Sequence, residues 1–328
     1  TPPFVTDSTE SPDLTRPDGL KRLRECTYCA LLAACAAITL LTPDAVIVTL
    51  PSAPAVLFPA ISILEFLTGT NWSPNPAGGG QAFGIIPLLI GTLVVTATAA
   101  LISIPVGTLT AIYLSEYATP NARSILKPLL EILAGIPTVV YGYFALVYVT
   151  PALKATLFPE MSTFNALSAS IMVGIMTIPM VSSISEDAMS AVPDELRQAG
   201  YGLGATKFEV STGIVVPASI SGIASSYILA VSRAIGETMI VVVAMGAQAR
   251  MPEVQEVAFG VPFINPADVL LDSGMTITVA MVQIAGGDLT GGTIPYDSMF
   301  ALGLALFVVT LVMNVISDII AERYREEY

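Results

Sequence analysis

The sequence contains no histidine, little charge and only three cysteines. Asp, Glu, Lys and Arg together make up 12% of its 328 residues, which is about half of what a soluble domain carries. Without histidine, the chain has no imidazole for acid–base catalysis or for holding a metal ion. We therefore expect no catalytic residue, no metal and no cofactor on this chain.

Cysteine and basic residues are also too few to define a site. Cys26 and Cys29 form a lone C-x-x-C pair, and Cys35 follows in the same apolar stretch. A redox or metal site needs further ligands, so we interpret the cysteines as structural or incidental. The net charge of −13 is opposite in sign to that of nucleic-acid-binding proteins, and no nucleic acid is expected as a partner.

Apolar residues take the place of the missing charge. They make up 54% of the chain, and the mean hydropathy is +0.75. Several apolar runs are long enough to cross about 30 Å of hydrocarbon. We therefore predict an all-α polytopic membrane protein with about six transmembrane helices. The predicted spans are residues 27–50, 84–115, 125–150, 164–185, 217–245 and 298–320. A shorter apolar stretch, 276–284, is predicted to be re-entrant or to lie against the outer face.

These spans predict four parts and an orientation. The parts are an N-terminal tail (1–27), a first transmembrane helix with an external segment (28–83), a transmembrane domain (84–320) and a C-terminal tail (321–328). Apart from Arg233, Lys154 and Arg250, every Lys and Arg lies in segments on one side of the predicted membrane. Basic residues favour the cytoplasmic side. Both tails and the loop 186–216 are therefore predicted to be cytoplasmic.

The loop 186–216 is the longest polar break on the predicted cytoplasmic side. Pro193 followed by two acids is typical of a helix start. We predict a helix over 193–203 that Gly204 ends, and a second short helix within 205–210. Small and apolar residues would share one face of the first helix, where another surface could approach closely: Leu196, Ala199, Gly200 and Leu203.

This loop resembles the EAA motif of ABC importer permeases, E-A-A-x3-G-x9-I-x-L-P. Glu195, Ala199, Gly204 and Pro217 match it. The departures are that Gln198 and Ala199 stand where the E-A-A spacing is loosest, that Gly200 replaces an alanine, and that "IVVP" replaces I-x-L-P. The stretches "LKPLLEILAGIPTVVYGYFAL", "FNALSASIMVGIMTIPMVSSISEDAMSAVP" and "SRAIGETM" extend the resemblance over roughly residues 60–320. Together they resemble the PstC family of phosphate permease subunits, which has the MetI-like, type I ABC importer permease fold.

The resemblance implies one subunit of an ATP-driven phosphate importer in a prokaryotic cell membrane. Its partners would be a PstA-like second permease, a PstB-like ATPase dimer that uses ATP and Mg²⁺, and a PstS-like phosphate-binding protein. The residues that couple to the ATPase would be Glu195, Ala199, Gly200, Gly204 and Pro217. This chain has no G-x-x-x-x-G-K-[ST] motif. It is therefore expected to be a transporter subunit and not an enzyme, with ATP hydrolysed on a separate subunit.

Two full charges lie inside the fifth predicted span. On a continuous helix, Arg233 and Glu237 would share one face with Cβ atoms about 6 Å apart. A charge at the bilayer centre costs about 2.5–3.5 kcal/mol, so the two side chains should face the bundle interior or an aqueous path. They form either a structural pair or part of the phosphate path, in which the fork of arginine donors fits phosphate oxygens. Ser232 and Thr238 would add hydroxyl donors.

Two further polar residues in or near the predicted spans are given expected contacts. Ser226 is a third candidate hydroxyl donor, and Glu131 is expected to pair with Lys127 one turn earlier.

The sequence also allows other functions. The chain could serve another oxyanion importer, for sulfate or molybdate. It could instead be an ion-coupled secondary carrier, although the EAA-type loop argues against that function. An intramembrane enzyme is disfavoured because the sequence contains neither histidine nor a G-x-S-x-G motif.

Overall fold

The computed structural model describes residues 19–49, 58–59, 61–74, 80–252, 254–256, 262–287 and 292–323. The chain divides into two units, Thr1–Ser52 and Ala53–Tyr328. In the first unit, helix α1 (Gly19–Thr49) carries the stretch Arg24–Thr42, which is long and apolar enough to cross a membrane. The side chains of this stretch are all exposed, including the three cysteines.

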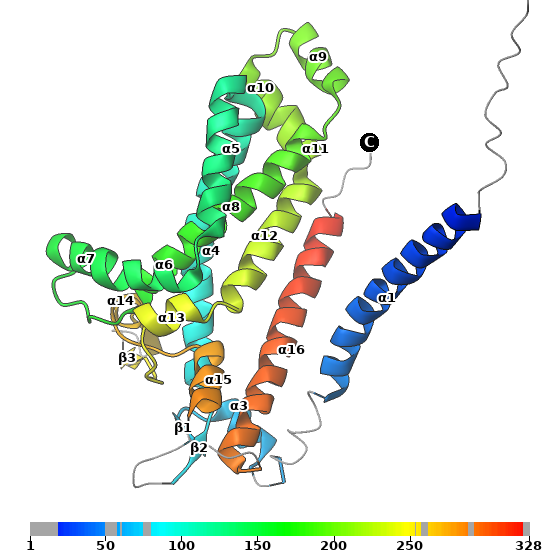
Figure 1. The fold of residues 1–328 in the computed structure, drawn as a ribbon. Coiled ribbons are helices and arrows are strands. Elements are labelled where there is room, and N and C mark those ends of the chain that lie inside the picture. Colours follow the sequence, from blue (N-terminus) through cyan, green and yellow to red (C-terminus); the bar gives the residue numbers. More distant parts are fainter. Residues whose placement is uncertain are drawn as a thin grey trace, which may run out of the picture. The chain divides into compact units, whose positions relative to one another are not determined.

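Four long helices organise the second unit (Figure 1). They are α4 (Ile86–Ile112), which continues as a π-helical turn to Tyr117, α8 (Ala166–Ser190), α12 (Ile220–Ile235) and α16 (Ile294–Arg323). α12 packs against the other three. The mean hydropathy of α4, α8 and α16 lets each of them cross a membrane alone.

Glycines bring α4 and α8 into close contact. A Cβ atom on Gly107 of α4 would lie 2.6 Å from the Cβ of Val181. A Cβ on Gly174 of α8 would lie 3.1 Å from the carbonyl oxygen of Ala99. The contacts follow the same order along both helices, which therefore run parallel. Small residues allow this backbone approach, as is common between transmembrane helices.

Two further spans are bent. α5 (Pro120–Gly135) meets the stretch Thr138–Thr156, which contains α6 (Thr138–Phe144) and α7 (Thr150–Thr156), at 89°. Pro137 keeps Ile136 out of the helical region (ψ 130°), which breaks the chain there. The stretch Lys207–Ala218 meets α12 at 71°. Within the described ranges, four helices that are each long and apolar enough to cross a membrane and two bent pairs give up to six candidate spans.

The predicted spans therefore need two corrections. The segment 125–150 is bent and not one straight helix. The segment 217–245 is wrong as a single helix, because α12 ends at Ile235 and the separate helix α13 (Met239–Ala244) follows. The apolar stretch predicted at 276–284 forms α15 (Ile277–Gly286), which packs against α4, α13 and α16.

The two ends of the second unit carry different elements (Figure 1). One end holds α9 (Asp194–Gly202), α10 (Lys207–Val210) and α11 (Val216–Ala218), which come from the loop 186–216 and the residues after it. The opposite end holds α3 (Ile63–Thr68) and the hairpin of β1 (Trp72–Ser73) with β2 (Ala82–Phe83).

The main hydrophobic core extends from the bundle into the hairpin end. Trp72 pairs with Phe83 across the hairpin, and both side chains are buried in the same core as those of the long helices. A second antiparallel hairpin joins β3 (Val254–Glu256) to β4 (Pro262–Ile264), and α14 (Pro266–Leu271) follows it. A smaller core lies beneath α9 and α10 and includes Met189 and Val210.

Candidate functional site

A cavity of about 340 Å³ lies between α5, α8 and α12. Leucine, methionine, proline, alanine and isoleucine side chains form most of its wall. Its charged residues are Arg233 from the last turn of α12, Lys127 and Glu131 from α5, and Glu186 from α8. A cavity with an apolar wall and a few charged groups is the usual form of a site for a small polar ligand.

Arg233 is the basic residue of this cavity whose charge no carboxylate balances. Its Nη2 lies 3.8 Å from the Sδ of Met176, a weak acceptor. Among the residues that the structure describes, no carboxylate oxygen lies within 4.0 Å of its guanidinium nitrogens. The planar set of donors is therefore available to an anion that enters the cavity.

Glu237 does not share a helical face with Arg233, so the expected geometry of this pair is wrong. α12 ends at Ile235 and its cap is Gly236, which places Glu237 in the break before α13. Its Oε1 accepts hydrogen bonds from the backbone N–H groups of Met239 (3.1 Å) and Ile240 (3.2 Å). Only 8% of Glu237 is exposed, and its carboxylate caps α13 instead of facing the cavity.

The three candidate hydroxyl donors also lie outside the wall of this cavity. Ser232 donates to the Oδ1 of Asn314 on α16 (2.7 Å), and Thr238 donates to the carbonyl of Gly236 (3.3 Å). Ser226 is buried against Ser185, with 2.9 Å between the hydroxyl oxygens. Arg233 is thus the one residue of the predicted path that the structure places on this wall.

Lys127 pairs with α8 and not with Glu131. Its Nζ lies 2.8 Å from Oε2 of Glu186 and 3.3 Å from Oδ1 of Asp187. Arg123 binds the other oxygen of Glu186, whose side chain is 1% exposed. The predicted Lys127–Glu131 pair is therefore wrong, and Glu131 lines the cavity instead. Sequence reasoning missed Glu186, although an acid at the end of an apolar helix was a signal.

The loop 186–216 contains the two short helices that its sequence predicts. α9 runs from Asp194 to Gly202 with Pro193 as its cap, and Gly204 adopts a φ of +84° just beyond it. A positive φ favours glycine, which has no Cβ. α10 begins with a capping box: Thr206 accepts from the N–H of Glu209, and Glu209 accepts from the N–H of Thr206.

Leu196, Ala199 and Gly200 lie at spacings of three and four on the helix α9 and share one face, as predicted, with Leu203 as the cap just beyond them. Their exposure differs, however. Gly200 is buried, and a Cβ there would lie 2.6 Å from the Cδ1 of Ile214. Leu196 is half-buried against the smaller core that includes Met189 and Val210. Ala199 is exposed, and Leu203 is 91% exposed. The other exposed residues of the loop include Glu195, Tyr201 and Phe208, whereas Pro217, just beyond it, is half-buried.

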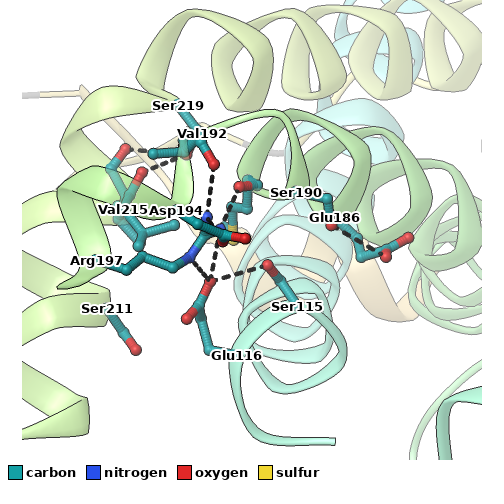
Figure 2. A network of polar contacts seen from close by, with 12 residues as sticks. Ser115, Glu116, Glu186, Ser190, Val192, Asp194, Arg197, Ser211, Val215 and Ser219 are labelled. Atoms are coloured by element: carbon teal, nitrogen blue, oxygen red, sulfur yellow. Dashed lines mark hydrogen bonds and ion pairs between the residues drawn. The ribbon is translucent and has the colours of Figure 1, made fainter. Parts of the chain in front are cut away.

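Arg197 fixes α9 to the bundle, as Figure 2 shows. Its Nη2 and Nε lie 3.1 Å and 3.4 Å from Oε1 of Glu116, at the end of the α4 span. The same guanidinium donates to the carbonyl oxygens of Met189 (2.8 Å) and Val192, and to the carboxylate of Asp194 (3.2 Å). Sequence reasoning missed this contact, because Arg197 and Glu116 lie far apart in the chain.

Residues 103–326 match the family described as "Binding-protein-dependent transport system inner membrane component". The chain is 30% identical over 298 residues to the "Probable ABC transporter permease protein YqgH" of Bacillus subtilis, which covers 90% of this chain and 89% of that protein. It is 32% identical over 280 residues to the "Phosphate transport system permease protein PstC" of Xylella fastidiosa, with 79% of each chain covered.

Solved structures of ABC importers share the fold. A bacterial transporter involved in the import of alginate matches with a TM-score of 0.57 at 15% identity and covers 92% of this chain and 99% of its own. The inward-facing MetNI methionine transporter matches with a TM-score of 0.51 at 15% identity and covers 74% and 95%. The second unit thus has the type I ABC importer permease fold, and the chain belongs to the family of inner membrane components of binding-protein-dependent transport systems.

Proposed function

We propose that this ABC importer permease carries phosphate across a prokaryotic cell membrane. The observation that carries the proposal is Arg233, an arginine without a carboxylate partner among the described residues, on the wall of a cavity between three bundle helices. The relatives named as phosphate transport permeases support the choice of substrate. The other residues predicted for the path do not line this cavity. They would affect the path only by positioning neighbouring residues: Ser232, Glu237 and Thr238.

The charges of the cavity suit a protonated phosphate. Arg233 offers several donors to the phosphate oxygens. Lys127 and Arg123 are already paired with the carboxylates of Glu186 and Asp187, so they do not hold the anion tightly. Glu131 replaces Glu237 as the carboxylate that faces the anion. It would accept a hydrogen bond from a protonated phosphate oxygen, which a sulfate ion at neutral pH cannot offer.

The proposed assembly contains a PstA-like second permease, a PstB-like ATPase dimer and a PstS-like binding protein. The loop 186–216 faces the cytoplasm and carries the ATPase contact. Leu203, Tyr201 and Phe208 support this assignment, because their exposed apolar side chains at the end of the bundle offer a surface for another protein. ATP and Mg²⁺ act on the ATPase, and phosphate arrives from the side of the β1–β2 hairpin.

Uptake of radiolabelled phosphate by the reconstituted complex tests the proposal. We expect Arg233→Gln to assemble normally and to lose most uptake, because the cavity loses the guanidinium that has no ion-pair partner among the described residues. Arg233→Lys should retain a part, since it keeps the charge and loses the fork. Lys154→Gln removes a positive charge from α7, outside this cavity, and should transport normally. Normal uptake by Arg233→Gln would contradict the proposed site.

The wild-type complex separates the alternative functions. Uptake of sulfate or molybdate without uptake of phosphate would assign the chain to another oxyanion importer. Phosphate uptake that persists without ATP would identify an ion-coupled carrier. We expect uptake of phosphate alone, and only when ATP and the ATPase are present.

A further inference from the structure

Two consecutive residues at the end of the α4 span hold both short helices of the loop 186–216. Glu116 binds Arg197 of α9, with 3.1 Å between Oε1 and Nη2. Beside it, the ring of Tyr117 lies beneath Lys207 of α10, with Nζ 5.1 Å from the ring centroid. The loop is therefore attached to α4 at two places, although α4 lies more than 70 residues earlier in the chain.

The first of these contacts is shielded from water. The side chain of Glu116 is 5% exposed and that of Arg197 is 15% exposed. Exposed ion pairs contribute little because water and salt screen them, whereas this pair is mostly removed from solvent. Ser115 also donates to the carboxylate of Glu116 (3.1 Å), which orients it toward the arginine (Figure 2).

Arg197 joins a third element to the same point. The carbonyl oxygens of Met189 and Val192, to which it donates, lie at or just beyond the C-terminal end of α8. The last carbonyls of a helix have no partner inside the helix, and a positive charge is favourable there. One guanidinium therefore contacts the ends of α4 and α8 from within α9.

We propose that the Glu116–Arg197 pair is the joint through which movement of the loop 186–216 reaches α4. The span Ile86–Tyr117 is helical over its whole length, and its far end contributes Pro87, Ile90 and Gly91 to a second cavity of about 330 Å³. A displacement of α9 thus has a continuous helical route to the opposite end of the bundle. This inference rests on the proposed contact between the loop and an ATPase.

Both members of the pair are positioning residues, because neither lines the cavity of Arg233. Their loss should therefore change how much transport each ATP produces, not the binding of the anion. Asp194 provides a matched control. It is an acid bound to the same guanidinium at 3.2 Å, but it belongs to α9 itself and its side chain is 84% exposed. Removing its charge leaves the contact with α4 intact.

The test measures phosphate uptake and ATP hydrolysis in the same proteoliposomes, with the full complex of permeases, ATPase and binding protein. We expect Glu116→Ala to keep the ATPase bound and to lower the ratio of phosphate moved to ATP hydrolysed at least about five-fold, the lower end of typical coupling between sites. Glu116→Gln keeps an acceptor oxygen and should lose less. Asp194→Asn should keep the wild-type ratio.

The outcomes separate this inference from the proposed function. A wild-type complex without ATP-driven phosphate uptake would refute the proposed function. A wild-type complex that transports, with an unchanged ratio in Glu116→Ala, would refute the joint alone. If Glu116→Ala and Glu116→Gln both fail to assemble, or if Asp194→Asn loses as much coupling as they do, the pair has only a structural role and the inference is wrong.

Discussion

Arg233 and Glu237 are four residues apart, yet the arginine lines a cavity and the glutamate caps the next helix. A separation of four residues places two side chains on one face only if the helix continues between them. Here α12 ends at Ile235, and Gly236 serves as its cap. The sequence indicated two charges in an apolar segment correctly. It did not reveal that the glutamate would bind backbone N–H groups of the next helix.

The structure predicts that Glu237 contributes stability separately from Arg233. Glu237→Ala removes the acceptor of two N–H groups of α13 and should cost about 0.5–2 kcal/mol, as for other lost helix caps. Glu237→Gln keeps an acceptor and should cost less. The thermal unfolding midpoint of the purified complex measures this difference.

The double variant Arg233→Gln/Glu237→Gln tests the same point through transport. The two side chains form no ion pair, so removing the charge of Glu237 does not compensate for the loss of the charge of Arg233. We expect uptake no higher than that of Arg233→Gln alone. Recovery of uptake in the double variant would instead support the structural pair that the spacing allowed.

At the scale of elements, local signals predicted the loop 186–216 well and the bent spans poorly. α9 and α10 lie within the predicted ranges 193–203 and 205–210, because the proline, acids and glycine that indicate them act over a few residues. Pro137 is visible in the sequence as an interruption, but the hydrophobicity on both sides led us to predict one span and not a bend of 89°. Hydropathy measures whether a segment can enter a membrane, not whether it is straight.

The turn between α9 and α10 gives a prediction at this scale. Gly204 has a φ of +84°, and a Cβ there would meet no atom within 4 Å, so the cost of Gly204→Ala is conformational and should be about 1–2 kcal/mol. We expect a reoriented α9 and weaker recovery of the ATPase in a pull-down. Gly202→Ala is the control, since its position is equally open without a positive φ. Equal recovery by both variants would show that the turn is not needed.

At the scale of the whole molecule, the fold class and the number of spans followed from hydropathy and from the resemblance to ABC permeases. The ion pairs did not. Glu116 and Arg197 are 81 residues apart, and Lys127 and Glu186 are 59 apart. No local pattern joins such residues, because their distance depends on how the helices pack. Arg233 was predicted as a site residue because a charge within an apolar span is visible in the sequence. The contact of Arg197 with Glu116 depends on helix packing and was therefore missed.

The close glycine contacts between α4 and α8 have a mechanical consequence for a transporter that must open alternately to two sides. Helices that pack this closely at Gly107 and Gly174 leave no room to slide past each other, so α4 and α8 should move as one rigid body. Spin labels at Leu109 and Ser190, both exposed, should report one unchanged distance by electron paramagnetic resonance throughout ATP turnover. Labels at Ile125 on α5 and Ser225 on α12 should instead report two different distances during turnover. The gate would then lie beside this pair of helices, and the two helices would shift together when the loop 186–216 moves.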